Sequence, residues 1–336
     1  MVHVAVVGAG IIGAALADAL VRRGATVTVI DASEPGSGTS GSSLAWLNAN
    51  QKLPRDYHDF SVRAMAEWRS LGDHSWYAPT GSLATGAGDR LDRLREWGYP
   101  VEELTTARAA ELEPALSVAA TAFFPSEAFV YGNEAVEALL RRASVRPLVT
   151  GGDVAFDVRG SRVSAVRLPD GARLRADLYV SCAGARTPAL LEPVGVTVPL
   201  DAGPAAPCLV TRAYGTVPVR RVVNTPSLSL RPVRNGVQLE AGDLDTSPDG
   251  VATLLDRARE LIRGFTPAST RHRVCVRPLP ADGHPIADRL PGLDNAYVTV
   301  THSGMTLGPL LGRLVATELV DATVLDDLKP YRLSRF

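Results

Sequence analysis

The chain has 336 residues, 46% of them hydrophobic, so it is long enough to bury a large core in one large or two interleaved domains. Its 35 Lys and Arg nearly balance its 36 Asp and Glu, which gives no long-range attraction to polyanions and argues against a nucleic-acid-binding protein. No apolar run approaches the length of a membrane span, and no basic segment precedes the first apolar run. We therefore expect neither a membrane protein nor a secretory signal.

The cysteines indicate the redox environment of the protein. Cys182, Cys208 and Cys275 are odd in number and widely spaced, so they fit neither a disulfide scaffold nor a zinc site. We expect a reduced, cytoplasmic protein with no metal site. The sequence does not indicate an oligomeric state.

The first 31 residues predict a βαβ unit. An apolar run from Val2 to Val7 enters a glycine turn, and a helix is expected from Ile11 to Arg23 with Gly24 after its end. A second strand, Val27 to Ile30, ends at Asp31.

A dinucleotide-binding motif occupies this unit. Gly8, Gly10 and Gly13 form G-x-G-x-x-G, in which the glycines permit a tight turn, the approach of a pyrophosphate and close packing of helix on strand. The helix N-terminus then faces the anion. Asp31 ends the second strand, where a carboxylate can accept ribose hydroxyls. The motif alone does not separate NAD from FAD.

Further elements follow a loop over residues 32–44. Helices are expected at 91–98, 107–112, 133–143, 254–265 and 306–319. Strands are expected at 154–158, 162–167, 177–181, 273–278 and 296–301, with a strand-rich region over 207–242.

The loop after Asp31 favours FAD over a nicotinamide cofactor. Its run of small residues, Pro35 to Ser43, lets the backbone pass close to an extended ligand and offer N–H groups to phosphate. The loop begins at the ribose-binding acid and leads into the apolar segment Leu44 to Leu47, which is unlike a solvated linker.

With this loop the sequence resembles the D-amino-acid-oxidase superfamily of FAD-dependent amine oxidoreductases, which includes glycine oxidase and sarcosine oxidase. The resemblance covers nearly the whole chain. Its landmarks are Gly8 to Gly13 with Asp31, Pro35 to Ser43, Gly81-Ser82-Leu83, Ala176 to Ala185, Arg277-Pro278 with Asp282-Gly283 and Pro285-Ile286, and His302 to Met305 with Gly308-Pro309.

The resemblance implies the fold class: α/β (α+β overall), with a Rossmann-like FAD-binding domain interleaved with an antiparallel-sheet substrate domain. The FAD-binding domain is expected to comprise residues 1–80, 145–205 and 270–336, and the substrate domain residues 81–144 and 206–269.

The resemblance and the motifs together predict the residues that bind FAD. Val154 would meet the adenine through its backbone, and the helix that begins near Ser303 would offer N–H groups to negative charge on the reduced flavin. Capping by Ser303 is an alternative role for that serine. The full set is Gly8, Gly10, Ile11, Ile12, Gly13, Asp31, Ala32, Ser33, Thr39, Ser40, Ser43, Leu44, Trp46, Leu47, Val154, Cys182, Ala183, Gly184, Arg277, Ser303, Gly304, Met305 and Thr306.

The resemblance places Arg277 on the substrate side of the flavin, where its guanidinium fork suits a carboxylate. His302 stands where related glycine oxidases have an arginine, so a carboxylate contact, a pocket role and a core role all stay open. Asn48, Tyr214, Ser229 and Leu244 complete the predicted substrate pocket. Ser229 leaves more room than the tyrosine of glycine oxidases, which predicts a substrate bulkier than glycine.

The expected activity is FAD-dependent oxidation of the C–N bond of a small amino acid or N-substituted glycine. The hydride goes to flavin N5, water hydrolyses the imine, and O2 reoxidises the flavin to give H2O2. One alternative is a sarcosine-oxidase-like enzyme with FAD bonded to Cys275, although non-covalent binding is favoured. Another is a D-amino-acid dehydrogenase that uses a different electron acceptor.

Overall fold

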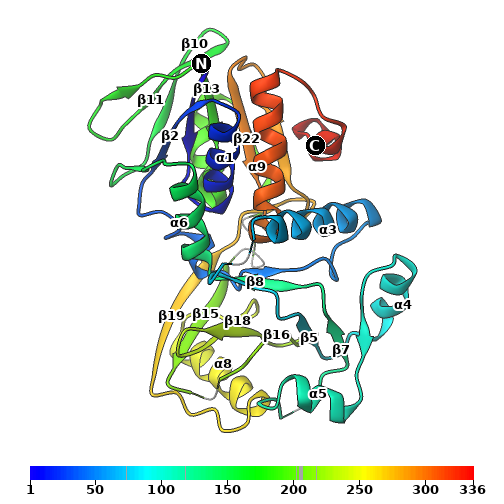
Figure 1. The fold of residues 1–336 in the computed structure, drawn as a ribbon. Helices are drawn as coiled ribbons and strands as arrows, with labels where there is room; N and C mark the ends of the chain where they lie inside the picture. Colours follow the sequence, from blue (N-terminus) through cyan, green and yellow to red (C-terminus); the bar gives the residue numbers. More distant parts are fainter. Residues whose placement is uncertain (73, 118, 202, 204–206, 217) are drawn as a thin grey trace.

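Two large sheets organise the chain (Figure 1). The computed structural model describes residues 1–336 apart from 73, 118, 202, 204–206 and 217. In Figure 1 the sheet that contains β1 lies in the upper half with helices α1 and α9, and the sheet that contains β15 lies in the lower half with helix α8. Both sheets take strands from segments that are far apart in the sequence.

The first sheet is the predicted Rossmann-like sheet. Its strand order is β21-β22-β13-β1-β2-β9, and all neighbours are parallel except β21, which runs antiparallel to β22. Buried apolar residues of β1, such as Val4 and Val6, account for its central position. Its strands are His3–Val7 (β1), Thr26–Asp31 (β2), Leu148–Val149 (β9), Leu178–Ser181 (β13), Ile286–Arg289 (β21) and Ala296–Val300 (β22).

Helices α1 (Ile11–Arg22) and α9 (Gly304–Asp321) pack along each other beside this sheet (Figure 1). Their approach depends on a small residue, because a Cβ on Gly312 would lie 2.7 Å from the backbone carbon of Ala15. The helix α6 (Gly132–Arg142) also packs on α1.

A 16-residue helix absent from the sequence predictions, α3 (Arg55–Ser70), packs against α9. Its buried residues Tyr57, Phe60, Ala64 and Trp68 recur at helical spacing, so the signal was present in the sequence.

The second sheet is mostly antiparallel, with the order β19-β15-β18-β17-β16-β5-β7-β6 and one parallel pair, β16 with β5. Helix α8 (Pro248–Leu261) contacts β15 and β18, and its buried Leu254 and Ala258 belong to their core cluster. The strands are Ser82–Ala84 (β5), Glu102–Glu103 (β6), Ala122–Phe124 (β7), Pro207–Tyr214 (β15), Val222–Asn224 (β16), Ser229–Val233 (β17), Gly236–Ala241 (β18) and Ser269–Val276 (β19).

Smaller elements complete the fold. The remaining helices are Thr39–Ser42 (α2), which lies in the predicted loop, Gly88–Glu96 (α4), Thr106–Leu112 (α5) and Thr187–Leu191 (α7). The remaining strands form the sheets β3-β8-β4 (Trp46–Leu47, Ala128–Val130, Tyr77–Ala78), β10-β11-β12 (Ala155–Arg159, Arg162–Arg167, Arg173–Leu174) and β14-β20 (Leu200–Asp201, Leu279–Pro280). Across the described residues, no helix combines the length and apolar character that a bilayer crossing requires.

The predicted fold class is confirmed by the two sheets, whereas the domain limits stay a prediction. Two elements cross those limits. Strand β19 begins at Ser269 and belongs wholly to the second sheet, and α6, expected in the substrate domain, packs on α1. The limit between residues 205 and 206 lies outside the described residues.

Candidate active site

A cavity of about 500 Å³ opens where the parallel strands of the first sheet end. Val7 ends β1, Asp31 ends β2, Cys182 follows β13 and Val300 ends β22, and all four residues line the cavity. The carboxyl ends of parallel strands are where α/β sheets bind ligands.

The glycine turn is shaped for close backbone approach. Gly8 has a φ of +115°, and a Cβ on it would lie 2.2 Å from the carbonyl oxygen of Cys182. A Cβ on Gly13 would lie 1.9 Å from the carbonyl oxygen of Gly8, so Gly13 lets α1 pack against the turn. Neither position accepts a side chain without a shift of the backbone, which is the steric requirement of a dinucleotide cradle.

Asp31 is fixed beside this turn. Its two carboxylate oxygens accept the backbone N–H groups of Ala9, over 2.6 Å, and of Ser33, over 2.9 Å. The hydroxyl of Ser40 accepts the N–H of Ile11 over 3.0 Å at the start of α1. The carboxylate therefore lies at the cavity wall with both oxygens oriented by the backbone.

Most residues predicted to bind the cofactor line the cavity. These are Gly8, Gly10, Ile11, Ile12, Asp31, Ala32, Ser33, Thr39, Ser40, Ser43, Val154, Cys182, Ala183, Gly184, Gly304 and Met305. Strand β19 also lines it, through Arg273, Val274 and Val276, which the sequence analysis did not single out as cofactor residues.

The other predicted cofactor residues lie outside the lining. Leu44 and Leu47 are buried in the hydrophobic core, the Trp46 indole donates to Glu127, and the Thr306 hydroxyl donates to the Trp46 carbonyl oxygen. Gly13, Ser303 and Arg277 are likewise absent from the lining.

The N-terminus of α9 reaches the cavity through Gly304 and Met305. Ser303 stands at the N-cap, yet its side chain makes no capping hydrogen bond. Its hydroxyl oxygen instead accepts the Lys52 ammonium over 2.8 Å and the Tyr57 hydroxyl over 3.0 Å, and it lies 3.2 Å from His302 Nε2. The expected capping role of Ser303 is therefore not observed, and its hydroxyl does not occupy the amides of the first turn.

A buried carboxylate, Glu127, holds the segment that leads from Trp46 to Lys52. Burial raises the pKa of Glu127, and hydrogen bonds from surrounding donors offset part of this effect. No sequence pattern pointed to it. Its donors are the Trp46 indole, the Ala49 and Asn50 backbone, the Asn50 amide, the Ser82 hydroxyl and the Tyr99 hydroxyl.

Arg277 follows the end of β19 and lies near Glu240, a partly buried carboxylate on β18. Burial raises the pKa of Glu240, and the positive charge of Arg277 opposes that shift. Glu240 is further held by the Leu44 backbone N–H over 2.9 Å. Arg277 thus lies between the two sheets, beside cavity residues Val276 and Pro278.

His302 lines the cavity and is kept uncharged. Its burial, reinforced by the positive charges of Lys52 and Arg277, lowers its pKa to about 3. Its Nδ1 is buried and has no hydrogen-bond partner among the described residues. The imidazole of His302 therefore contacts the cavity as an uncharged group.

The predicted substrate residues do not gather at one place. Tyr214 pairs with Ser269 at one end of β15, whereas Val276, next to Arg277, pairs with Pro207 at the other end. Seven residues of strand place Tyr214 about 23 Å from that end, so Tyr214 does not lie beside Arg277.

Leu244 packs against the core cluster under the second sheet, and the Ser229 hydroxyl accepts the Asn224 amide over 2.7 Å. Asn48 is buried, and its backbone N–H approaches the Thr306 hydroxyl. None of these three residues lines the described cavity. Ser229 nevertheless pairs across the sheet with Glu240, the carboxylate that acts on Arg277, so a substrate bulkier than glycine stays a prediction.

Cys275 is turned away from the cavity. Its neighbours Val274 and Val276 line the cavity, whereas Cys275 is 1% exposed and packs with Cys208 and Val210. Because successive side chains of a strand point to opposite faces, this geometry argues against a covalent bond from Cys275 to the flavin. Around the described residues, no group of His, Cys, Asp and Glu side chains is arranged to hold a metal ion.

These features define a dinucleotide-dependent enzyme whose cavity lies between a Rossmann-like sheet and a second sheet that carries an arginine. The sequence matches the family described as FAD dependent oxidoreductase (DAO) over residues 3–318, so the chain belongs to that family.

Known relatives agree with this assignment. Glycine oxidase of Geobacillus kaustophilus (strain HTA426) is 27% identical over 99% of this chain and 96% of its own length. A crystal structure of glycine oxidase from Geobacillus kaustophilus superposes with a TM-score of 0.83, at 25% identity, over all of both chains. An uncharacterized oxidoreductase, YurR of Bacillus subtilis (strain 168), is 25% identical over 97% of each chain. The chain is thus an FAD-dependent oxidoreductase.

Proposed function

We propose that the chain oxidises a small amino acid or N-substituted glycine to an imine, which water then hydrolyses. When bound, FAD accepts the two electrons and the α-hydrogen as a hydride equivalent. O2 is the proposed final electron acceptor, with H2O2 as its product. The likeness to glycine oxidase over the full chain supports the substrate class.

We place the cofactor along the cavity in the direction that the motifs indicate. Asp31 would accept ribose hydroxyls, Val154 would contact the adenine, and the turn around Gly10 would hold the pyrophosphate. The flavin ring would then lie at the other end, beside His302 and Gly304. The glycine cradle supports this placement, because its backbone leaves space that side chains would fill.

The position of Arg277 carries the proposal for the substrate. The guanidinium stands at the end of β19, on the side of the second sheet and within electrostatic reach of His302. A guanidinium binds both oxygens of a carboxylate, so an α-carboxylate held here would have its Cα turned toward the flavin. The negative charge of Glu240 offsets the positive charge of Arg277 between substrates.

His302 contributes a hydrogen-bonding group without a charge. Because its pKa is lowered to about 3, it stays neutral at physiological pH, and the two cations at the site are Arg277 and Lys52. A neutral imidazole also avoids competition with Arg277 for the carboxylate. We therefore assign His302 to shaping the end of the cavity and not to proton transfer.

An anaerobic absorbance screen tests this function. The FAD-bound protein is mixed without O2 with glycine, sarcosine, N-alkylglycines, D-amino acids and proline, and the loss of flavin absorbance is followed. At least one of these acids should reduce the flavin within seconds. A full set of acids that leaves the flavin oxidised would refute the proposed substrate class.

Air is then admitted to the reduced protein. Rapid return of the absorbance with one H2O2 per flavin supports O2 as the acceptor. Slow return in air, with fast return on addition of a quinone, would favour the dehydrogenase alternative.

A further inference from the structure

A partly buried amine lies behind the cavity at the start of α9, outside the roles assigned above. Lys52 lies between β3 and α3, and its ammonium donates to the Ser303 hydroxyl over 2.8 Å. Tyr57 donates to the same oxygen. The Ser303 hydroxyl thus accepts twice, and His302 Nε2, 3.2 Å away, is within reach of its own proton.

This arrangement concentrates positive charge. Within the described part of the chain, no carboxylate forms an ion pair with Lys52, and Glu127 acts on it only at longer range. Burial lowers the pKa of Lys52 to about 8, because the surrounding groups stabilise the charged ammonium less well than water does. Arg277 is a second cation near His302, since the charges of both Lys52 and Arg277 act on that imidazole.

Helix α9 adds to the positive electrostatic potential around Lys52. It has 18 residues, and the positive end of its dipole points at the cavity through Gly304 and Met305. Its cap residue leaves the first-turn amides without a side-chain acceptor. Lys52 and the N-terminus of α9 therefore both favour negative charge at this end of the cavity.

Two negative charges are available to such a site. The substrate brings a carboxylate, and transfer of a hydride to the flavin leaves one negative charge on the ring. Arg277 lies on the side of the second sheet, where the carboxylate is proposed to bind, whereas Lys52 is joined to the cap of α9. The amine and the helix dipole therefore act on the same end of the cavity, next to His302.

We propose that Lys52, anchored on Ser303 at the start of α9, is the cation that stabilises the negative charge of the reduced flavin and so raises its reduction potential. This inference rests on the proposed placement of the flavin ring, but not on the identity of the substrate. In this arrangement Arg277 stabilises the substrate carboxylate, and Lys52 stabilises the negative charge of the reduced flavin.

The test compares K52M with K329M, because Lys52 and Lys329 are the only lysines of the chain and Lys329 is exposed and paired with Asp326. Each FAD-bound protein is reduced slowly without O2 beside a reference dye, which gives the equilibrium ratio of reduced to oxidised flavin. That ratio should fall at least about tenfold in K52M, equivalent to about 30 mV for a two-electron couple. It should stay unchanged in K329M.

Two further variants keep the test decisive. K52R retains the charge and should recover most of the ratio. S303A keeps the Lys52 amine but removes the hydroxyl that accepts its hydrogen bond, so it should lower the ratio by less than K52M does. S303A replaces K52M in the comparison if K52M does not retain FAD. No amino acid is needed in this measurement, so its outcome is independent of the proposed substrate.

An unchanged ratio in FAD-bound K52M would overturn the inference. So would a K52M protein whose flavin ratio is normal while carboxylate ligands, such as acetate, perturb its flavin spectrum only at much higher concentration. That second result would assign Lys52 to the substrate.

Discussion

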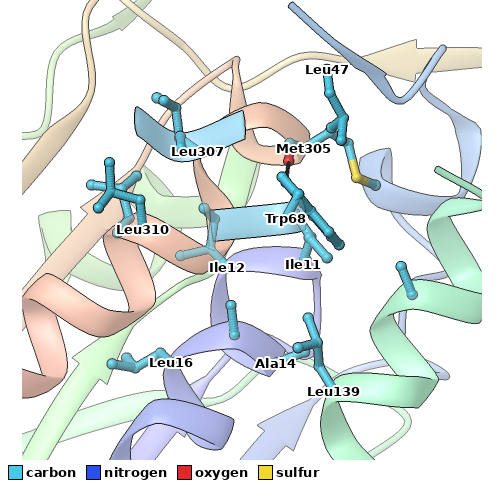
Figure 2. Packing of buried hydrophobic residues seen from close by; sticks show 14 of the residues in the cluster. Ile11, Ile12, Ala14, Leu16, Leu47, Trp68, Leu139, Met305, Leu307 and Leu310 are labelled. Carbon is cyan, nitrogen blue, oxygen red and sulfur yellow. Dashed lines mark hydrogen bonds between the residues drawn. The ribbon is translucent and has the colours of Figure 1, made fainter. Parts of the chain in front are cut away.

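Trp68 donates its indole N–H to the carbonyl oxygen of Met305 over 2.8 Å (Figure 2). This bond joins the last turn of α3 to the first turn of α9, the turn that reaches the cavity. Figure 2 shows Ile11 and Ile12 of α1 beside the same turn. The end of the cavity assigned to the flavin is thus positioned by a helix that carries no cofactor motif.

We expect Trp68→Phe to destabilise the protein. Trp68 is fully buried, so the smaller ring leaves a void, and the Met305 carbonyl loses a donor. Together these losses cost about 2 kcal/mol in the free energy of unfolding. Urea unfolding with excess FAD measures this, and Trp97→Phe, in a partly exposed position, should change stability far less. Equal effects of the two variants would contradict the structural role of Trp68.

Glu127→Gln should destabilise the protein more than its small size change suggests. Both oxygens of Glu127 face only donors, so the amide NH2 of glutamine would point at other N–H or O–H groups. Loss of these charge-assisted bonds costs about 3 kcal/mol. The segment that carries Lys52 should also loosen, which limited proteolysis would detect.

Glu134→Gln is the matched control for that variant. Glu134 pairs with Arg234 at the surface, and exposed pairs of this kind contribute about 0–1 kcal/mol. If both glutamine variants unfold at the same urea concentration as the parent protein, Glu127 does not have the stabilising role that its hydrogen bonds indicate.

Gly8→Ala should abolish FAD retention. The added methyl would lie 2.2 Å from the Cys182 carbonyl oxygen, at a φ that alanine rarely adopts. The comparison is Gly88→Ala, where no atom lies within 4 Å of the new methyl group. Flavin absorbance per mole of purified protein should be near zero in the first variant and normal in the second. Full flavin content in Gly8→Ala would show that the turn does not hold the cofactor.

His302 should make stability depend on acid pH. Its pKa is about 3 in the folded chain against an ordinary 6.5, so between these values the unfolded chain binds more protons. Stability is therefore complete above pH 6.5 and falls as the pH drops toward 3. Between pH 7 and pH 5 the loss due to this residue is about 1–2 kcal/mol.

The measurement is the difference in unfolding free energy between the parent and His302→Asn at each pH. That difference should shift by this amount between pH 7 and pH 5. The exposed His74→Asn should produce no such shift. A difference that does not vary with pH would mean that His302 is protonated as easily in the folded chain as in the unfolded chain.

The cofactor half of the site was predictable because its signals are local. Gly8, Gly13 and Asp31 lie within one βαβ unit, where spacing alone fixes their relative positions. The periodic apolar positions of α3 carried the same kind of local signal, which the sequence analysis did not use.

The substrate half depends on contacts that spacing does not reveal. The position of Tyr214 follows from strand length and register, since one end of β15 lies at Arg277 and the other lies far from it. Glu127 accepts hydrogen bonds from Trp46, which precedes it by 81 residues, and from Asn50, which precedes it by 77 residues. Lys52 meets Ser303 across 251 residues. Such contacts exist only after the two sheets have assembled.

The measurement closest to the central claim uses a matched pair of compounds, an N-substituted glycine and the corresponding amine without the carboxylate. Anaerobic flavin reduction by each is measured in the parent, in Arg277→Met and in Arg271→Met, an exposed control on the same strand. The parent and the control should prefer the acid by about 100-fold in reduction rate per concentration, the equivalent of about 3 kcal/mol, and this preference should largely disappear in Arg277→Met. An undiminished preference in Arg277→Met would contradict the claim that this arginine anchors the substrate.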